Sequence, residues 1–97
     1  MFEDCYFDFD AHKNTILQKE RGVSFEQIII LIENGNVIAV KPHHNQKKYQ
    51  NQHIAEILAG DYICLVPFVV DGNKVFLKTV YLSRKATKSY KRGKIDA

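Results

Sequence analysis

The side chains best suited to chemistry lie in a basic segment near the end of the chain, at 78–92. The segment begins as an apolar strand and continues into the run SRKATK at 83–88, with Tyr81 and Tyr90 among its cations. Clustered Lys and Arg neutralise phosphates and release counterions, so this pattern is typical of a protein that binds a phosphate-bearing partner. The alternative is a basic terminal segment that is only solvated.

Composition and charge bound the class of protein. The chain has 97 residues, 45% of them hydrophobic, and a net charge of +3, which fit one globular domain over 1–97. Acidic residues gather near the N-terminus and basic residues near the C-terminus, which indicates that one end faces nucleic acid or an acidic partner. The two cysteines show no metal-ligand spacing, and the pair His43-His44 has no further ligand at a recognisable spacing, so we expect no metal. We also expect no cofactor. The longest apolar run, at 62–70, is too short to span a bilayer, and no leader pattern is seen, so we expect a cytoplasmic protein.

Two helices are predicted before the sheet. Asp10 is a suitable N-cap for a helix over 11–21, which Gly22 ends. Ser24 and Gln27 form a capping box for a second helix. Apolar residues then follow at the spacing of one helical face: Phe25, Ile28, Ile29 and Ile32.

Four strands are predicted after the helices, at 36–41, 52–58, 62–70 and 74–82. Asp71-Gly72 is a hairpin signal, and Pro67 indicates a bulge or an edge position. The first ten residues contain a short edge strand or an extended lead-in. Short connections favour an antiparallel sheet, so we expect the α+β class with a short C-terminal helix from near Arg84 and a disordered tail at 93–97.

Three segments of the chain carry a resemblance to a known family. They are Phe9-Asp10 with Lys13-Asn14, the run RGVSFE at 21–26, and the run SRKAT at 83–87. In order and spacing they resemble the BrnT family of type II toxin–antitoxin ribonuclease toxins, which have a small RelE-like fold. The resemblance implies a metal-independent endoribonuclease that cuts RNA and inhibits translation. It also implies a cognate antitoxin, a small DNA-binding protein of the ribbon-helix-helix kind, as partner.

Metal-independent RNA cleavage needs a base, a cation beside the phosphorane and an acid for the leaving oxygen. Arg84 matches the family's arginine, and its guanidinium fits a phosphate through two parallel hydrogen bonds. Lys78 falls on a strand face whose other residues are mostly apolar, so its side chain either lines a cleft or extends to the solvent at the edge of that face. His44 and His53 are candidate bases because imidazole titrates near neutral pH, and Tyr90 is a candidate acid or stacking residue.

Further residues are candidates for RNA binding. Lys47 and Lys48 flank Tyr49, a mixture of cations and an aromatic ring that is typical of single-strand binders. Lys85 and Lys88 add cations after the last strand. Neighbouring residues on a strand face opposite ways, so Lys85 shares a phosphate with the preceding arginine only if the strand has ended there.

Two other functions stay open. The family has an acidic residue after its closing motif, whereas Lys88, Ser89 and Tyr90 follow Thr87 here. The segment at 43–49 also carries Lys and His where the family carries Arg, and Lys lacks the guanidinium fork. The protein is then a module that binds nucleic acid without catalysis, or one that binds only an antitoxin.

Overall fold

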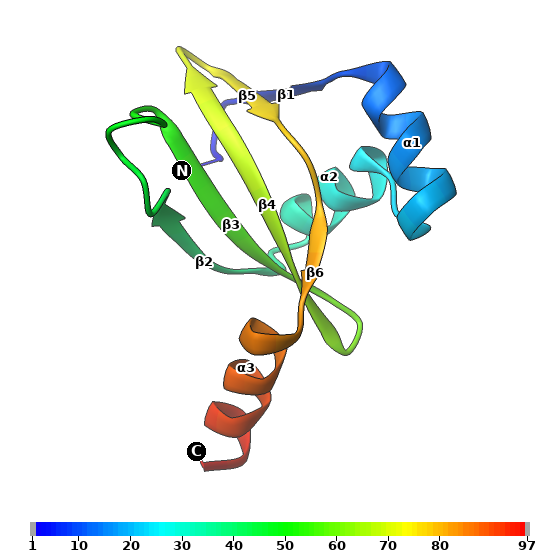
Figure 1. The fold of residues 1–97 in the computed structure, drawn as a ribbon, viewed down its shortest axis with the longest axis vertical. Helices are drawn as coiled ribbons and strands as arrows, with labels where there is room; N and C mark the ends of the chain where they lie inside the picture. Colours follow the sequence, from blue (N-terminus) through cyan, green and yellow to red (C-terminus); the bar gives the residue numbers. More distant parts are fainter. Residues whose placement is uncertain (1, 97) are drawn as a thin grey trace.

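The chain folds into three helices and a mixed β-sheet, and α1 and α2 cover one side of that sheet (Figure 1). The computed structural model describes residues 2–96, and the side chains of residues 2–93. Among these residues, no helix has the length and apolar character needed to cross a membrane. The elements follow in the order β1 (Tyr6–Phe9), α1 (Ala11–Arg21), α2 (Phe25–Glu33), β2 (Val37–Pro42), β3 (Gln52–Ala59), β4 (Tyr62–Asp71), β5 (Lys74–Leu77), β6 (Tyr81–Ser83) and α3 (Arg84–Asp96).

The predicted helix signals are confirmed. The Asp10 side chain accepts a hydrogen bond from the backbone N–H of Lys13, and Gly22 closes α1 in the left-handed conformation at φ 65°. Both halves of the capping box between Ser24 and Gln27 are present at the start of α2. The α+β class that these signals indicated is therefore confirmed.

Buried Asn14 joins the two helices at their corner. Its side-chain oxygen accepts a hydrogen bond from the backbone N–H of Phe25 at 2.8 Å, and its amide nitrogen donates to a carboxylate oxygen of Glu26. Asn14 is 8% exposed, so both polar ends of its amide are satisfied away from water. The amide thus fixes how α1 turns into α2.

The sheet differs from the predicted four antiparallel strands in two ways. The short N-terminal segment is a true edge strand, β1, and it runs parallel to β5, so the sheet is mixed. The predicted fourth strand at 74–82 is divided into β5 and β6, which both pair with β4. The sheet order is β1-β5-β4-β3-β2, with β6 beside β4.

A bulge beside Pro67 explains the division. Phe68 pairs with Leu77 and Leu65 pairs with Tyr81, so two residues of β4 face the three residues 78–80. The carbonyl oxygen of Pro67 accepts the backbone N–H of Lys78 at 2.8 Å. Because the N and O of one strand residue point to the same side, the proline nitrogen also faces 78–80 and has no hydrogen to donate there. The sequence signal at Pro67 therefore marks an irregularity in the neighbouring strand.

The two faces of the sheet have different roles. Strand register places Phe68, His53 and Leu77 on the face that α1 and α2 cover. The core there consists of almost fully buried side chains, including Leu17, Phe25, Ile28, Ile57, Val66, Phe68, Val75 and Leu77. The opposite face, here called the open face, carries the alternate residues, and the start of α3 packs against one end of it.

Candidate functional site

Two hydrogen-bonded hydroxyls set the start and direction of α3. Ser83 Oγ accepts the backbone N–H of Ala86 at 3.0 Å, which is the geometry of an N-cap. Thr87 Oγ1 donates to the carbonyl oxygen of Ser83 at 2.6 Å and accepts the backbone N–H of Ile63 at 2.9 Å. The helix is thus anchored at its first turn on β4, and it then projects away from the sheet (Figure 1). It continues to Asp96, through most of the segment predicted as a disordered tail, and Ala97 lies outside the described residues.

A groove of about 350 Å³ lies between the start of α3 and the open face of the sheet. We call it the α3 groove. It brings together two residues from distant segments that the sequence indicated, His44 from the loop after β2 and Lys85 from α3. Its lining consists of Lys41, Pro42, His44, Ile54, Glu56, Leu65, Ser83, Lys85, Ala86 and Ser89.

An ion pair that the sequence did not indicate joins the neighbouring strands β2 and β3 on the sheet side of the groove. Lys41 Nζ lies 2.8 Å from Glu56 Oε2, and the two side chains are 68% and 16% exposed. Glu56 projects from the middle of β3 on the open face, opposite in parity to buried Ala55 and Ile57. The alternation of side chains along this strand was therefore enough to predict from the sequence that Glu56 faces away from the core.

His44 sits in a stack of rings beside the groove. The ring centroids of His43 and His44 are 4.3 Å apart, and Tyr49 lies 4.3 Å from His43 on a tilted plane. Burial, and then the neighbouring His44, lower the pKa of His43 from its ordinary value. The Nδ1 atom of His43 also accepts the backbone N–H of Asn45 at 3.0 Å, which requires that this nitrogen carry no proton.

The other base candidate, His53, lies on the opposite side of the sheet. Its ring stacks on Phe68 at 5.6 Å with an interplanar angle of 21°. Its Nδ1 atom is buried and has no hydrogen-bond partner within the described part of the chain. Because His53 faces the core and His44 faces the α3 groove, the two histidines do not serve one site.

Arg84 and Lys85 are separated because the strand ends at Ser83. On a helix, neighbouring residues point about 100° apart, and Lys85 lines the groove whereas Arg84 does not.

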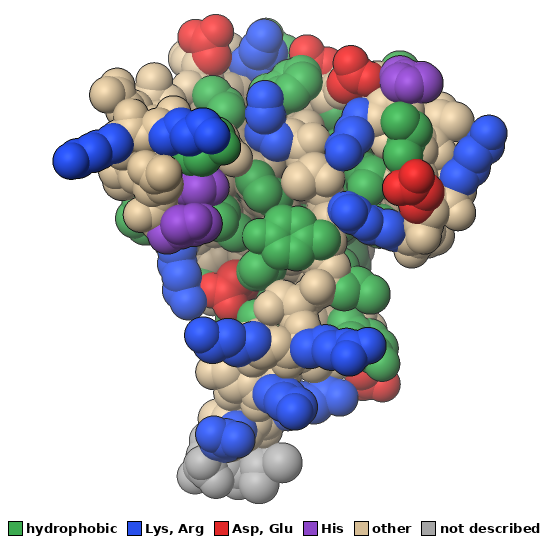
Figure 2. Space-filling model, in the orientation of Figure 1, with side chains coloured by type: hydrophobic (Ala, Val, Ile, Leu, Met, Phe, Trp, Pro, Cys, Tyr) green, Lys and Arg blue, Asp and Glu red, His purple; other side chains and the backbone are tan. Residues whose placement is uncertain are grey.

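The same helical geometry gathers the cations of α3 within an arc of about 120° around the helix axis. We call this exposed set the α3 basic stripe, and Figure 2 shows Lys and Arg gathered over this part of the molecule. Its members are Arg84, Lys85, Lys88, Lys91 and Arg92.

The remaining predicted residues lie around the groove rather than in it. Lys78 is exposed at the bulge, and its ammonium lies 5.6 Å from the ring centroid of Phe76. Tyr90 is half-buried on the side of α3 away from the basic stripe. Lys47 and Lys48 are exposed in the loop that carries the histidine stack, and the Lys48 ammonium lies 5.3 Å from the ring centroid of Tyr49.

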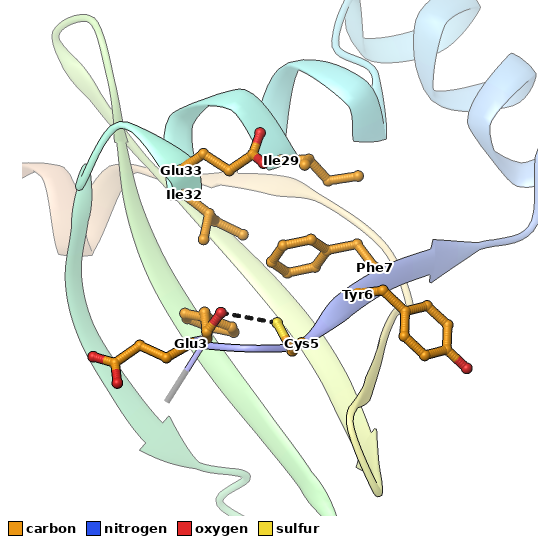
Figure 3. A pocket seen from close by; sticks show the side chains of 8 residues that line it. Glu3, Cys5, Tyr6, Phe7, Ile29, Ile32 and Glu33 are labelled. Atoms are coloured by element: carbon orange, nitrogen blue, oxygen red, sulfur yellow. Dashed lines mark hydrogen bonds between the residues drawn. The ribbon is translucent and has the colours of Figure 1, made fainter.

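A larger hollow of about 650 Å³ lies between β1 and α2 (Figure 3). Phe7, Ile29 and Ile32 form its apolar wall, while Glu3 and Glu33 supply carboxylates at its border. The thiol of Cys5 donates a hydrogen bond to the carbonyl oxygen of Phe2, and burial raises the pKa of that thiol. Because its charged groups are acidic and its thiol is a poor nucleophile, this hollow does not suit a phosphate-bearing ligand.

The polar side chains of the described residues form a partly basic groove and no cluster of metal ligands. Within residues 2–96, no three His, Cys, Asp or Glu side chains gather as ligands for an ion. The groups that meet in the α3 groove are an imidazole, two ammonium groups, one carboxylate and two hydroxyls.

Comparisons with protein-family models, with curated protein sequences and with solved structures find no match for this chain.

Proposed function

We propose that this protein is a metal-independent endoribonuclease, the toxin of a type II toxin–antitoxin pair, which inhibits translation by cutting RNA. The observation that carries the proposal is the α3 groove, where His44 and Lys85 line one cavity beside the basic stripe. A general base and a cation beside the phosphorus both favour attack of a ribose 2′-hydroxyl on the adjacent phosphorus. The resemblance to BrnT toxins supports the same reaction.

The reaction assigns roles to the four ionisable groups of the groove. His44 takes the proton of the 2′-hydroxyl as its oxygen bonds to phosphorus. The Lys85 ammonium lies beside the non-bridging oxygens, where negative charge grows in the phosphorane. The bond to the 5′-oxygen then breaks, and that oxygen takes up a proton from solvent water, which leaves a 2′,3′-cyclic phosphate and a 5′-hydroxyl. His44 returns the proton that it took to the solvent. Glu56, which Lys41 holds at 2.8 Å, is a second group able to accept the proton.

Electrostatic attraction supports the choice of RNA as the ligand. The α3 basic stripe begins at the groove and continues along the exposed side of the helix. The start of α3 adds the partial positive charge of a helix N-terminus. Phosphates on either side of the cut bond would therefore meet cations along the helix.

A module that binds nucleic acid or an antitoxin without cutting is the second candidate. It is favoured by the structural roles of the residues that carry the family resemblance. Asp10 and Ser24 cap helices, and Thr87 ties α3 to β4. Arg84, the expected phosphate ligand, lies outside the groove lining. A small ribbon-helix-helix antitoxin that covers the basic stripe remains the partner we propose in either case.

Cleavage by matched variants tests the proposal. End-labelled single-stranded RNA is incubated with pure protein in EDTA, and the initial rate is compared among wild type, His44→Ala and Lys85→Ala. Loss of the general base is expected to slow cleavage by about 10²–10⁴-fold. Lys19→Ala removes the same charge from exposed α1 and is expected to cut normally. Wild-type protein that retains RNA on a filter but leaves it intact would favour the second candidate.

A further inference from the structure

The bulge at 78–80 places two aromatic side chains on the open face. Phe76 pairs with Val69, and Tyr81 pairs with Leu65, and both β4 residues belong to the open face. With a regular strand, side chains five positions apart would point to opposite faces. The extra residue reverses that alternation, so Phe76 and Tyr81 share a face that α1 and α2 leave uncovered.

These rings lie between cations. Tyr81 is 37% exposed and Phe76 is half-buried, and the Lys78 ammonium lies 5.6 Å from the Phe76 ring centroid. Lys74 shares this face by its register with Asp71, at the hairpin end. Figure 2 shows this face of the molecule, with hydrophobic side chains along the middle, Lys and Arg on both sides, Asp and Glu along the upper edge, and further cations over α3.

The two rings are placed for different nucleotides of one strand. Val69 and Leu65, their partners on β4, are four residues apart, and at about 3.3 Å per residue this separates the rings by about 13 Å along the sheet. Tyr81 lies nearer the α3 groove than Phe76 does. Its β4 partner Leu65 lines that groove, and so does Ser83, two residues further along β6. Asp8 stands beside Phe76 on β1, so the backbone phosphates would pass on the side of Lys78.

We propose that Tyr81, with Phe76 behind it, is a stacking platform that binds unpaired bases of single-stranded RNA and leads the strand into the α3 groove. This proposal rests on the proposed function for the cleavage reaction in the groove, and it adds that the substrate is single-stranded RNA. Aromatic rings bind bases through their exposed faces, which a duplex hides within its own stack. The open face also carries Asp8, Asp71 and Glu56, and Glu56 is paired with Lys41. The cations that suit the phosphates of RNA are therefore Lys78 beside the platform and the α3 basic stripe.

Binding of an uncleavable ligand tests the platform separately from catalysis. A short 2′-O-methyl oligonucleotide, labelled with a fluorophore, is titrated with protein at fixed salt and followed by anisotropy. Tyr81→Ala is expected to weaken binding by roughly 5- to 100-fold, the usual effect of losing one stacked base. Tyr81→Phe should bind as wild type does. Ile30→Ala removes a 56% exposed side chain of α2, on the opposite side of the sheet, and it should also bind normally.

Three measurements distinguish stacking from a general effect on the fold. Tyr81→Ala carries no change of charge, so the slope of log affinity against log salt should stay as in wild type. With the wild-type protein, an oligonucleotide of abasic sites keeps the phosphates but lacks bases to stack on either ring, and it should bind at least as weakly as Tyr81→Ala binds the intact oligonucleotide. A duplex of the same sequence should bind less tightly than the single strand.

Contrary results separate the two proposals. Equal affinity of wild type and Tyr81→Ala, or of single strand and duplex, would overturn the platform even if RNA is cut in the groove. Loss of affinity in Tyr81→Ala with no cleavage by wild type would support the platform and reject the endoribonuclease. No binding of the oligonucleotide by wild type would overturn the platform.

Discussion

Thr87 Oγ1 in α3 accepts the backbone N–H of Ile63 in β4 at 2.9 Å, and both groups are buried. The same hydroxyl donates to the carbonyl oxygen of Ser83, one helical turn earlier. A single side chain therefore satisfies a strand N–H and fixes the first turn of the last helix. Through it, the position of Lys85 in the groove depends on a residue that does no chemistry.

Thr87→Val is expected to destabilise the protein by about 1–3 kcal/mol, because it leaves the buried N–H of Ile63 without an acceptor. Thr87→Ser keeps the hydroxyl and should lose less. Urea unfolding followed by circular dichroism measures both. A valine variant as stable as wild type would show that this hydrogen bond does not hold α3 on the sheet.

The α3 basic stripe is expected to act on affinity rather than on the chemical step. Replacement of Lys88 and Arg92 by Gln should reduce the slope of log affinity against log salt by about 0.7 for each lost phosphate contact. The rate at saturating RNA should not change. Lys13→Gln with Lys19→Gln is the matched control on α1, and a control with the same effect would mean that only net charge matters.

Arg84 and Lys85 are expected to differ although they are neighbours. Lys85→Ala should lower kcat by about 10²–10³-fold, the usual loss when one donor to a developing charge is removed. Arg84→Ala should raise KM and leave kcat near the wild-type value, since Arg84 does not line the groove. Single-turnover cleavage at saturating protein separates the two effects. The reverse pattern would place the reacting phosphate at Arg84.

The histidine stack predicts a pH dependence of stability. Burial and the neighbouring His44 lower the pKa of His43, so in mildly acidic solution the folded protein holds fewer protons than the unfolded chain. Stability should therefore fall as pH drops below about 6.5, the ordinary value for histidine, and stay level above it. Imidazole NMR shifts across the titration report this group directly. A His43 pKa at or above the ordinary value would contradict the stacked, acceptor geometry of the loop.

Local sequence signals predicted the helices well because each signal acts within a few residues. Asp10 and Ser24 cap the helices that their spacing indicated, and Gly22 closes α1. The sheet was predicted less well because its pairing joins distant segments. Nothing local to Tyr6–Phe9 shows that this segment runs parallel to β5.

The predicted assignment of side chains to the two sheet faces is wrong after the bulge at 78–80. Unbroken alternation from Phe76 to Leu82 would put both on one face with Lys78, but the extra residue at 78–80 sends Leu82 to the Cys64 side. Pro67 carried the signal, yet its missing N–H acts on the neighbouring strand rather than on its own. For the site, the sequence indicated His44 and Lys85 but not Glu56, because the closeness of β3 to α3 is a tertiary contact.

The chemical ends of the RNA products test the central claim most directly. Single-stranded RNA is incubated with pure protein in EDTA, and the termini of any fragments are identified by mass spectrometry. Our account predicts fragments with a 2′,3′-cyclic phosphate and a 5′-hydroxyl, formed by wild type and greatly reduced in His44→Ala and Lys85→Ala. Intact RNA, or fragments that form equally with both variants, would contradict cleavage in the α3 groove.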